Sequence, residues 1–240
     1  MKIGVISDIH GNAEALNNVL KDIELKGAEK IFCLGDLAMG GYDPNYTIEK
    51  IFSLKNCEII QGNTDKLIVD YNNEVYNDLY KKDPLMANAL KLDVVEITDS
   101  NKQRLKNLPE QKEVDVYGVN FLLCHGSPRK QNENLYPDTD IKIVEEAARN
   151  TNADIVLTGH THMPCGFTLN DGKIIVNAGS VGRSRTKDKM PVYLLITVNK
   201  DKTCEFEHRR IIYDNKKVSK IIEERDFEFS KEFSKLYIEE

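Results

Sequence analysis

An aspartate and a histidine follow the first apolar run of the chain, in the order Asp8-Ile9-His10. Side chains two residues apart on an extended chain point to the same side, so this carboxylate and this imidazole can reach one point beyond the run. Both groups are common ligands of divalent cations. Taken alone, such a pair more often caps or forms hydrogen bonds than binds metal, so its meaning depends on partners elsewhere in the chain.

Five further candidate ligands stand in the same kind of position, at the end of an apolar run and close to a glycine: Asp36, Asn63, His125, His160 and His162. Each one alone has an ordinary structural interpretation as a turn or strand-end residue. Seven oxygen and nitrogen donors are more than one ion can use once water is counted, which favours two ions sharing a carboxylate. Because no thiolate belongs to the set, we expect Mn, Fe, Co, Ni, Zn or Mg.

The segments that carry these residues alternate between strand and helix patterns. We expect a helix over residues 13–26, N-capped by Asn12, a strand over 30–34, a helix over 44–54 and a strand over 57–61. Alternation of this kind predicts a mainly parallel sheet, and such sheets bind ligands beyond the carboxyl ends of their strands.

The middle of the chain is polar and helical in period, and we interpret residues 66–112 as a helical insertion flanking the site, broken at Pro84 and at the cap beginning with Thr98. After it we expect a hairpin of residues 113–116 and 119–124, a helix over 140–150 and a strand over 154–157.

The last third changes to short β-rich runs, followed by a charged tail. Residues 166–169, 173–176, 192–198 and 204–212 are predicted to pair antiparallel as a second sheet. The expected architecture is an α/β sandwich of two sheets with outer helices, in a single domain over residues 1–240. The tail from about 214 to 240 is predicted to be helical and to pack outside or against a partner, so a homo-oligomer stays an open alternative.

Length and composition describe an ordinary folded protein. The 240 residues carry a net charge of -6 with scattered Lys and Arg, which disfavours a long nucleic-acid track. The start lacks the pattern of a secretory signal, and no apolar run reaches the roughly 18 residues of a membrane span. Five cysteines without a C-x-x-C pair suit a reducing compartment, so we expect a cytoplasmic protein that does not bind membranes.

The motifs in order resemble those of the calcineurin-like metallophosphoesterase superfamily over residues 1 to about 185: Asp8-Ile9-His10, Gly35-Asp36, Gly62-Asn63, His125-Gly126 and Gly159-His160-Thr161-His162. The fuller words Asp8-Ile9-His10-Gly11-Asn12, His125-Gly126-Ser127-Pro128 and Asn177-Ala178-Gly179-Ser180-Val181-Gly182 are most similar to its small bacterial and archaeal phosphodiesterase branch, which includes relatives grouped with diadenosine tetraphosphate hydrolases. The resemblance implies a four-layer αββα sandwich of two mixed β-sheets flanked by helices.

The resemblance also implies two divalent metal ions, manganese first among the candidates. One ion would be held by Asp8, His10, Asp36 and His162, and the other by Asp36, Asn63, His125 and His160, with Asp36 as the bridge. A hydroxide held between two cations is a strong nucleophile at neutral pH. We therefore expect hydrolysis of phosphodiester or phosphoanhydride bonds in a small, nucleotide-like phosphorylated substrate, with catalytic roles for Asp36, Asn63, His125 and Asn12.

One motif departs from the family pattern, because Gly62-Asn63-Thr64-Asp65 has a threonine where many relatives have the histidine that protonates the leaving oxygen. A threonine hydroxyl cannot serve as that acid, and Asp65, without the histidine, is interpreted as a helix N-cap. Protonation matters little when the leaving group is a phosphate, whose second pKa is about 6. Phosphoanhydrides and aryl esters are therefore predicted to react better than simple alkyl phosphates.

Further side chains are candidates for contact with the substrate. Asn12 could donate its amide to a phosphate while also capping a helix, and Arg183 and Arg185 could clamp a distal phosphate. Tyr42 and Tyr136 could stack on a base. His208, inside a charged run, is assigned a surface role.

Three other functions share the fold implied by the resemblance. A non-catalytic scaffold is disfavoured because all seven ligand positions are present, and a DNA nuclease because the chain is acidic. A protein serine/threonine phosphatase is disfavoured because its Gly-Asn-His-Glu word is absent.

Overall fold

The computed structural model describes residues 1–225 and 227–238, which contain two five-stranded sheets. In spatial order the first sheet consists of β10 (Cys204–Arg210), β9 (Val192–Val198), β1 (Lys2–Ile6), β2 (Lys30–Cys33) and β3 (Cys57–Ile59). The second consists of β4 (Gln111–Val116), β5 (Val119–Cys124), β6 (Ile155–Thr158), β8 (Ile174–Asn177) and β7 (Cys165–Thr168). The β1-β2-β3 and β5-β6-β8 neighbours are parallel, so both sheets are mixed.

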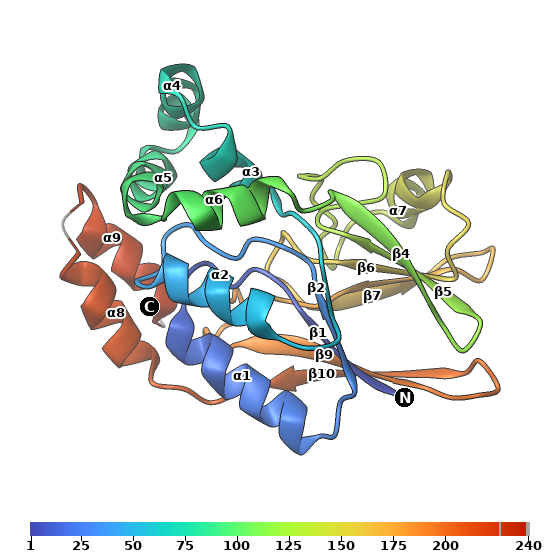
Figure 1. The fold of residues 1–240 in the computed structure, drawn as a ribbon. Helices are drawn as coiled ribbons and strands as arrows, with labels where there is room; N and C mark the ends of the chain where they lie inside the picture. Colours follow the sequence, from blue (N-terminus) through green and yellow to red (C-terminus); the bar gives the residue numbers. More distant parts are fainter. Residues whose placement is uncertain (226, 239–240) are drawn as a thin grey trace.

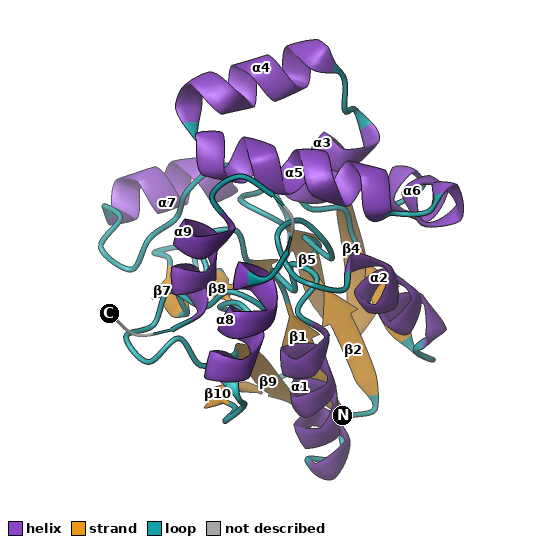
Figure 2. Ribbon diagram, turned by 90° about the vertical axis from the view of Figure 1, so that its left-hand side faces the viewer, coloured by secondary structure: helices purple, strands orange, loops and turns teal. Residues whose placement is uncertain are grey.

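Helices cover both outer faces of the two sheets (Figures 1 and 2). Helices α1 (Ala13–Leu25) and α2 (Pro44–Ser53) lie on the first sheet, and α7 (Ile141–Ala148) lies on the second. Beyond one end of the sandwich are α3 (Asn63–Val69), α4 (Asn73–Lys82), α5 (Pro84–Glu96) and α6 (Asp99–Lys106). The chain finishes with α8 (Asn215–Glu223), α9 (Ser230–Ser234) and a 3₁₀ turn over Lys235–Tyr237.

Alternation along the strands explains the layers. In β1, Ile3 and Val5 enter the core between the sheets, whereas Ile6 packs with the helices on the outer face. In β5, Phe121 and Leu123 face the same inner core, while Leu122 packs with α7. A strand with apolar residues at both parities must be covered on both faces. The predicted αββα sandwich is therefore confirmed.

The partition of the late strands differs from the prediction. Strands β7 and β8 belong to the second sheet, but β9 and β10 belong to the first, where β9 pairs antiparallel with β1. The expectation that all four runs build one sheet was wrong. Local pattern identified each strand, but the partner of β9 lies about 190 residues earlier in the chain and leaves no local signature.

The helix boundaries in the middle region follow the predicted breaks. Pro84 occupies the first turn of α5, and the Thr98 side chain accepts a hydrogen bond from Asn101 N at the start of α6. The predicted helical tail is broken into shorter pieces, and residues 226, 239 and 240 lie outside the described residues. None of the described helices combines the length and apolar character that crossing a membrane requires.

Candidate metal centre

The candidate ligands lie where three parallel strands of the first sheet and two parallel strands of the second sheet end. Asp8 follows β1, Asp36 follows β2, Asn63 follows β3, His125 follows β5 and His160 follows β6. Five residues of the set have left-handed backbone conformations, with φ between 49° and 65°: Asp8, His10, Asp36, His160 and His162. Such conformations cost free energy in residues other than glycine and persist only where surrounding contacts impose them.

Each carboxylate has one oxygen held by the backbone and one directed at histidines. Asp8 Oδ2 accepts a hydrogen bond from His160 N at 3.0 Å, and its Oδ1 lies 3.2 Å from His162 Nε2. Oδ1 of Asp8 also lies 3.7 Å from His125 Nε2. The backbone hydrogen bond orients the carboxylate, so the free oxygen points into the centre.

Asp36 is oriented in the same way from the neighbouring strand. Its Oδ1 accepts a hydrogen bond from Thr64 N at 2.8 Å, and its Oδ2 lies 3.3 Å from His125 Nε2 and 3.8 Å from His10 Nε2. Gly62 precedes the donor, and a Cβ there would collide with Asp36 Oδ1. The glycine therefore permits the close approach of the two strand ends.

Three histidine rings are fixed through Nδ1, which lies against a backbone carbonyl: that of Met39 for His10 (3.1 Å), Leu34 for His125 (2.7 Å) and Arg183 for His162 (2.5 Å). A carbonyl only accepts, so Nδ1 carries the hydrogen in each ring. In the neutral rings Nε2 then presents a lone pair to the centre, which is the arrangement found in histidines that bind metal ions.

Several polar atoms of the candidate ligands have no hydrogen-bond partner. Asp8 Oδ1, Asn63 Oδ1 and His125 Nε2 are buried and unpartnered among the described residues. Such atoms are rare in folded proteins because losing water without a replacement is costly. They are of the ligand types that divalent cations take, so the residues fit a metal centre.

Within the described residues, the ligand atoms form two groups that could each hold a metal ion: Asp8, His10 and His162, and Asp8, Asp36 and His125. Asp8 is common to both groups, while Asp36 Oδ2 faces histidines of both, so bridging by Asp36 stays a prediction. The ring of His160 lies beside that of His125, with centroids 5.4 Å apart, and belongs to neither group.

The electrostatics of the cluster favour a positive charge within it. Burial alone would lower the pKa of His125, but the charges of Asp36 and Asp8 raise it to about 10. Burial would raise the pKa of Asp8, but the neighbouring histidines hold it well below its ordinary value. Burial and the charge of Arg183 keep the pKa of His10 well below its usual range, which leaves its Nε2 lone pair available.

Asp65 is not itself the N-cap residue, but its carboxylate caps α3 from the third helical position, so the predicted capping role is confirmed in part. It is the third residue after the N-cap Gly62, and its carboxylate accepts hydrogen bonds from the amides of Asp36 (2.8 Å), Leu37 (2.9 Å) and Gly62 (3.0 Å). Burial, together with the charge of Asp36, raises the pKa of Asp65 to about 7. Asp65 therefore ties together the ends of β2 and β3, a role that the N-cap interpretation missed.

Asn12 is the N-cap of α1, as predicted, with its Oδ1 accepting from Ala15 N at 3.1 Å. Its Nδ2 donates to Gly182 O at 2.9 Å and lies 3.4 Å from Tyr213 Oη, and the side chain is fully buried. These bonds join the first turn to the loop after β8. The contact of Asn12 with a phosphate stays a prediction.

Arg183 lies beside the centre and Arg185 lies farther out. The Arg183 guanidinium is 3.5 Å from His10 Nε2 and stacks over the Phe233 ring, 5.4 Å from its centroid. Arg185 is exposed, with Nη1 3.5 Å from Tyr136 Oη. The hydroxyl of Tyr42 accepts from Glu14 N at 2.9 Å. Of these four candidates, the structure therefore brings Arg183 to the histidine cluster.

A support absent from the sequence analysis comes from the helical region and the tail. The buried carboxylate of Asp93, in α5, accepts from Met39 N (2.9 Å) and Gly40 N (3.0 Å) and pairs with Arg225 at 3.1 Å. Met39 is the residue whose carbonyl orients His10. The only sequence feature that could have drawn attention to Asp93 is a carboxylate on the apolar helix 84–96.

The chain is similar to known proteins over most of its length. Residues 1–201 match the family model described as the calcineurin-like phosphoesterase superfamily domain. An uncharacterized protein of Methanocaldococcus jannaschii is 33% identical over 240 residues, covering 93% of each chain. The fold is similar to that of a hypothetical protein from Pyrococcus horikoshii (TM-score 0.88, 22% identity) and a metallophosphoesterase from Sphaerobacter thermophilus (TM-score 0.79, 21% identity), each covering 99% of this chain and 98% of the other.

Proposed function

The chain belongs to the calcineurin-like phosphoesterase superfamily, and from this membership and the geometry of the strand ends we propose that it is a dinuclear metal-dependent phosphoesterase. In this proposal it hydrolyses phosphodiester or phosphoanhydride bonds of small, nucleotide-like substrates. The observation that carries the proposal is the set of buried, unpartnered atoms Asp8 Oδ1, Asn63 Oδ1 and His125 Nε2, all of which are acceptors when the His125 ring is neutral. Cations would satisfy these acceptors and remove the cost of burying them.

The proposed ligands follow the family pattern. Asp8, His10, Asp36 and His162 would hold one cation, and Asp36, Asn63, His125 and His160 would hold the other. Oxygen and nitrogen donors suit Mn, Fe, Co, Ni, Zn or Mg, and manganese is our first choice. Bound there, divalent cations would lower the pKa of water toward about 7 and neutralise phosphoryl oxygens.

The chain itself supplies orientation and charge. The carbonyls of Leu34, Met39 and Arg183 hold three imidazoles in fixed tautomers, so the ligand atoms need not reorganise when a substrate binds. The Arg183 side chain makes no ion pair with a carboxylate among the described residues and contacts His10, Met86 and Phe233. A guanidinium without a carboxylate partner favours a phosphoryl oxygen as its partner.

Thr64 supports a preference for good leaving groups. Its hydroxyl donates to Ala38 O at 3.2 Å, and the residue is buried. It therefore offers no proton to a departing oxygen. Phosphate and phenolate leaving groups need little protonation, because their conjugate acids are far stronger acids than an alcohol.

The test is hydrolysis by protein loaded with Mn²⁺, with bis-p-nitrophenyl phosphate, a dinucleoside polyphosphate and glycerol phosphate as substrates. We expect turnover of the first two and much slower turnover of glycerol phosphate, with loss of activity in Asp36→Ala. A preference for glycerol phosphate would contradict the leaving-group argument. Elemental analysis that finds no bound transition metal after loading would contradict the metal centre and favour the scaffold alternative.

The cellular compartment and the binding partner of the enzyme belong to the same proposal. We place the enzyme in the cytoplasm, which free cysteines favour, since such thiols persist under reducing conditions. Its expected partner is a small phosphorylated molecule, not long nucleic acid or a membrane. Salt-sensitive binding to duplex DNA would instead support the nuclease alternative.

A further inference from the structure

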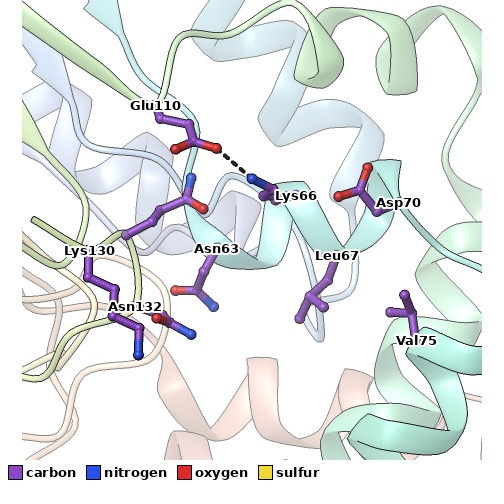
Figure 3. Close-up of a pocket in the computed structure, with 9 residues that line it drawn as sticks. Asn63, Lys66, Leu67, Asp70, Val75, Glu110, Lys130 and Asn132 are labelled. Carbon is purple, nitrogen blue, oxygen red and sulfur yellow. Dashed lines mark hydrogen bonds and ion pairs between the residues drawn. The ribbon is translucent and has the colours of Figure 1, made fainter.

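A pocket of about 390 Å³ opens beside the candidate ligand Asn63 (Figure 3). On one side, Asn63 is accompanied by Lys130 and Asn132 from the loop that follows β5. The opposite side carries the aliphatic side chains of Leu67 and Val75 from α3 and α4. The pocket thus has an end formed by Asn63, Lys130 and Asn132 and an opposite end formed by Leu67 and Val75, where Asp70 also lies.

Hydrogen bonds hold the end with Lys130 in place relative to the centre. Lys130 closes a tight turn in which Ser127 N donates to Lys130 O at 3.0 Å, and this turn begins two residues after His125. The adjacent Gln131 donates from Nε2 to Gln61 O at 2.9 Å, two residues before Asn63. Because the loop is tied to the ends of both β5 and β3, the distance between Lys130 and the centre is constrained.

The two lysines of the pocket differ in their partners. Lys66 pairs with Glu110 at 2.5 Å, so its charge is already matched (Figure 3). Lys130 makes no ion pair within residues 1–225 and 227–238. Asp70 lies on the Lys66 side, away from Lys130 (Figure 3). An anion entering the pocket would therefore be drawn to the end formed by Lys130 and Asn132.

We propose, resting on the proposed phosphoesterase function, that this pocket is the binding site for the leaving group and that Lys130 and Asn132 bind a phosphate group on it. The substrate class is then a phosphoanhydride, because Thr64 supplies no proton and a phosphate departs without one. Leu67 and Val75 contact the less polar part of the leaving group beyond that phosphate. Arg183, which lies beside His10, would then contact the phosphoryl group that is attacked.

The reaction balances without a further reactant. The oxygen of water forms a bond to phosphorus while the bond from phosphorus to the bridging oxygen breaks. The electron pair of the broken bond stays on the departing phosphate, and the proton of water is released to solvent. The ammonium group of Lys130 would stabilise the negative charge that develops on the departing phosphate.

The experiment compares Lys130→Met and Lys130→Arg with Lys142→Met, a control at an exposed lysine of α7 outside the pocket. Binding of pyrophosphate and of malonate to metal-free protein is measured by calorimetry. We expect Lys130→Met to weaken pyrophosphate binding about tenfold, as for loss of one charge-assisted contact. Lys130→Arg should retain most of the affinity, and Lys142→Met should not change it.

The kinetic arm separates the pocket from the proposed function. In Lys130→Met loaded with Mn²⁺, kcat/KM for a dinucleoside polyphosphate should fall about tenfold more than kcat/KM for bis-p-nitrophenyl phosphate, whose leaving group carries no phosphate. Equal losses on both substrates, or no loss of pyrophosphate affinity, would overturn the pocket assignment while leaving the phosphoesterase function intact. Tighter binding of malonate than of pyrophosphate would overturn the choice of phosphate. If the wild type hydrolyses neither substrate, the proposed function fails, and calorimetry alone decides whether the pocket binds phosphate.

Discussion

The Nε2 atoms of His10 and His162 lie 3.1 Å apart, although the two residues are 152 positions apart in the chain. In each ring Nδ1 faces a backbone carbonyl, so in the neutral rings both Nε2 atoms carry lone pairs. Facing lone pairs repel at this distance unless a cation or a proton lies between them. The fold thus holds together two groups that favour a shared positive charge.

Binding of Mn²⁺ is expected to raise the free energy of unfolding, because the cation binds the folded chain and not the unfolded one. At a free concentration one hundred times the dissociation constant, the gain is about 2.7 kcal/mol per site. Urea unfolding with chelator and with Mn²⁺ measures it. The gain should shrink in His162→Ala and persist in His208→Gln, which keeps a donor for Asn177 O. Equal gains in all three proteins would count against His162 as a ligand.

Replacing Asp65 by asparagine should loosen the junction between β2 and β3. The new amide group would present hydrogens to at least one of the three backbone N–H donors that now share the carboxylate. We expect a loss of about 2 kcal/mol in the free energy of unfolding and weaker Mn²⁺ binding, both measured at pH 8. The same change at Asp99, whose side chain is fully exposed, is the control and should alter neither quantity. Unchanged Mn²⁺ affinity in Asp65→Asn would show that the junction does not support the centre.

The Arg225 contact is expected to matter because its partner Asp93 is completely buried. Arg225→Met leaves that carboxylate without its cation, and breaking a buried pair in this way costs about 3 kcal/mol. The double variant Arg225→Met, Asp93→Asn should be more stable than Arg225→Met alone, since it also removes the buried charge. Chemical denaturation of the four proteins in this cycle measures the coupling. Additive effects would rule out an energetic link between the tail and α5.

The stability contributed by Asp93 should depend on pH. Burial, the main cause, raises its pKa from 3.8 to about 6. Since the folded pKa is above the unfolded one, the folded chain binds the proton more tightly, and this stabilisation is full below about pH 4 and is lost as pH rises through about 6. Relative to Asp93→Asn, the metal-free wild type should therefore lose about 2.4 kcal/mol between pH 4 and pH 7. A difference between the two proteins that stays constant over this range would contradict the raised pKa.

Part of the structure follows from local pattern. Apolar residues at both parities in β1 and β5 required covering on both faces, and helical segments between the early strands predicted parallel order. Carboxyl ends of parallel strands share one edge, so side chains at those positions were expected to meet. The prediction failed for β9 and β10, whose partners are decided by register with distant strands.

By itself, the sequence determined the layered fold and which residue types stand at the strand ends, because burial periodicity and strand-end position are local properties of the chain. Only the tertiary structure decided which atoms those residues contact. The amides held by Asp65 include that of Asp36, 29 positions away, and the partner of Asp93 is 132 positions away. Such contacts depend on how separate segments pack against one another, and no spacing within a single segment encodes them.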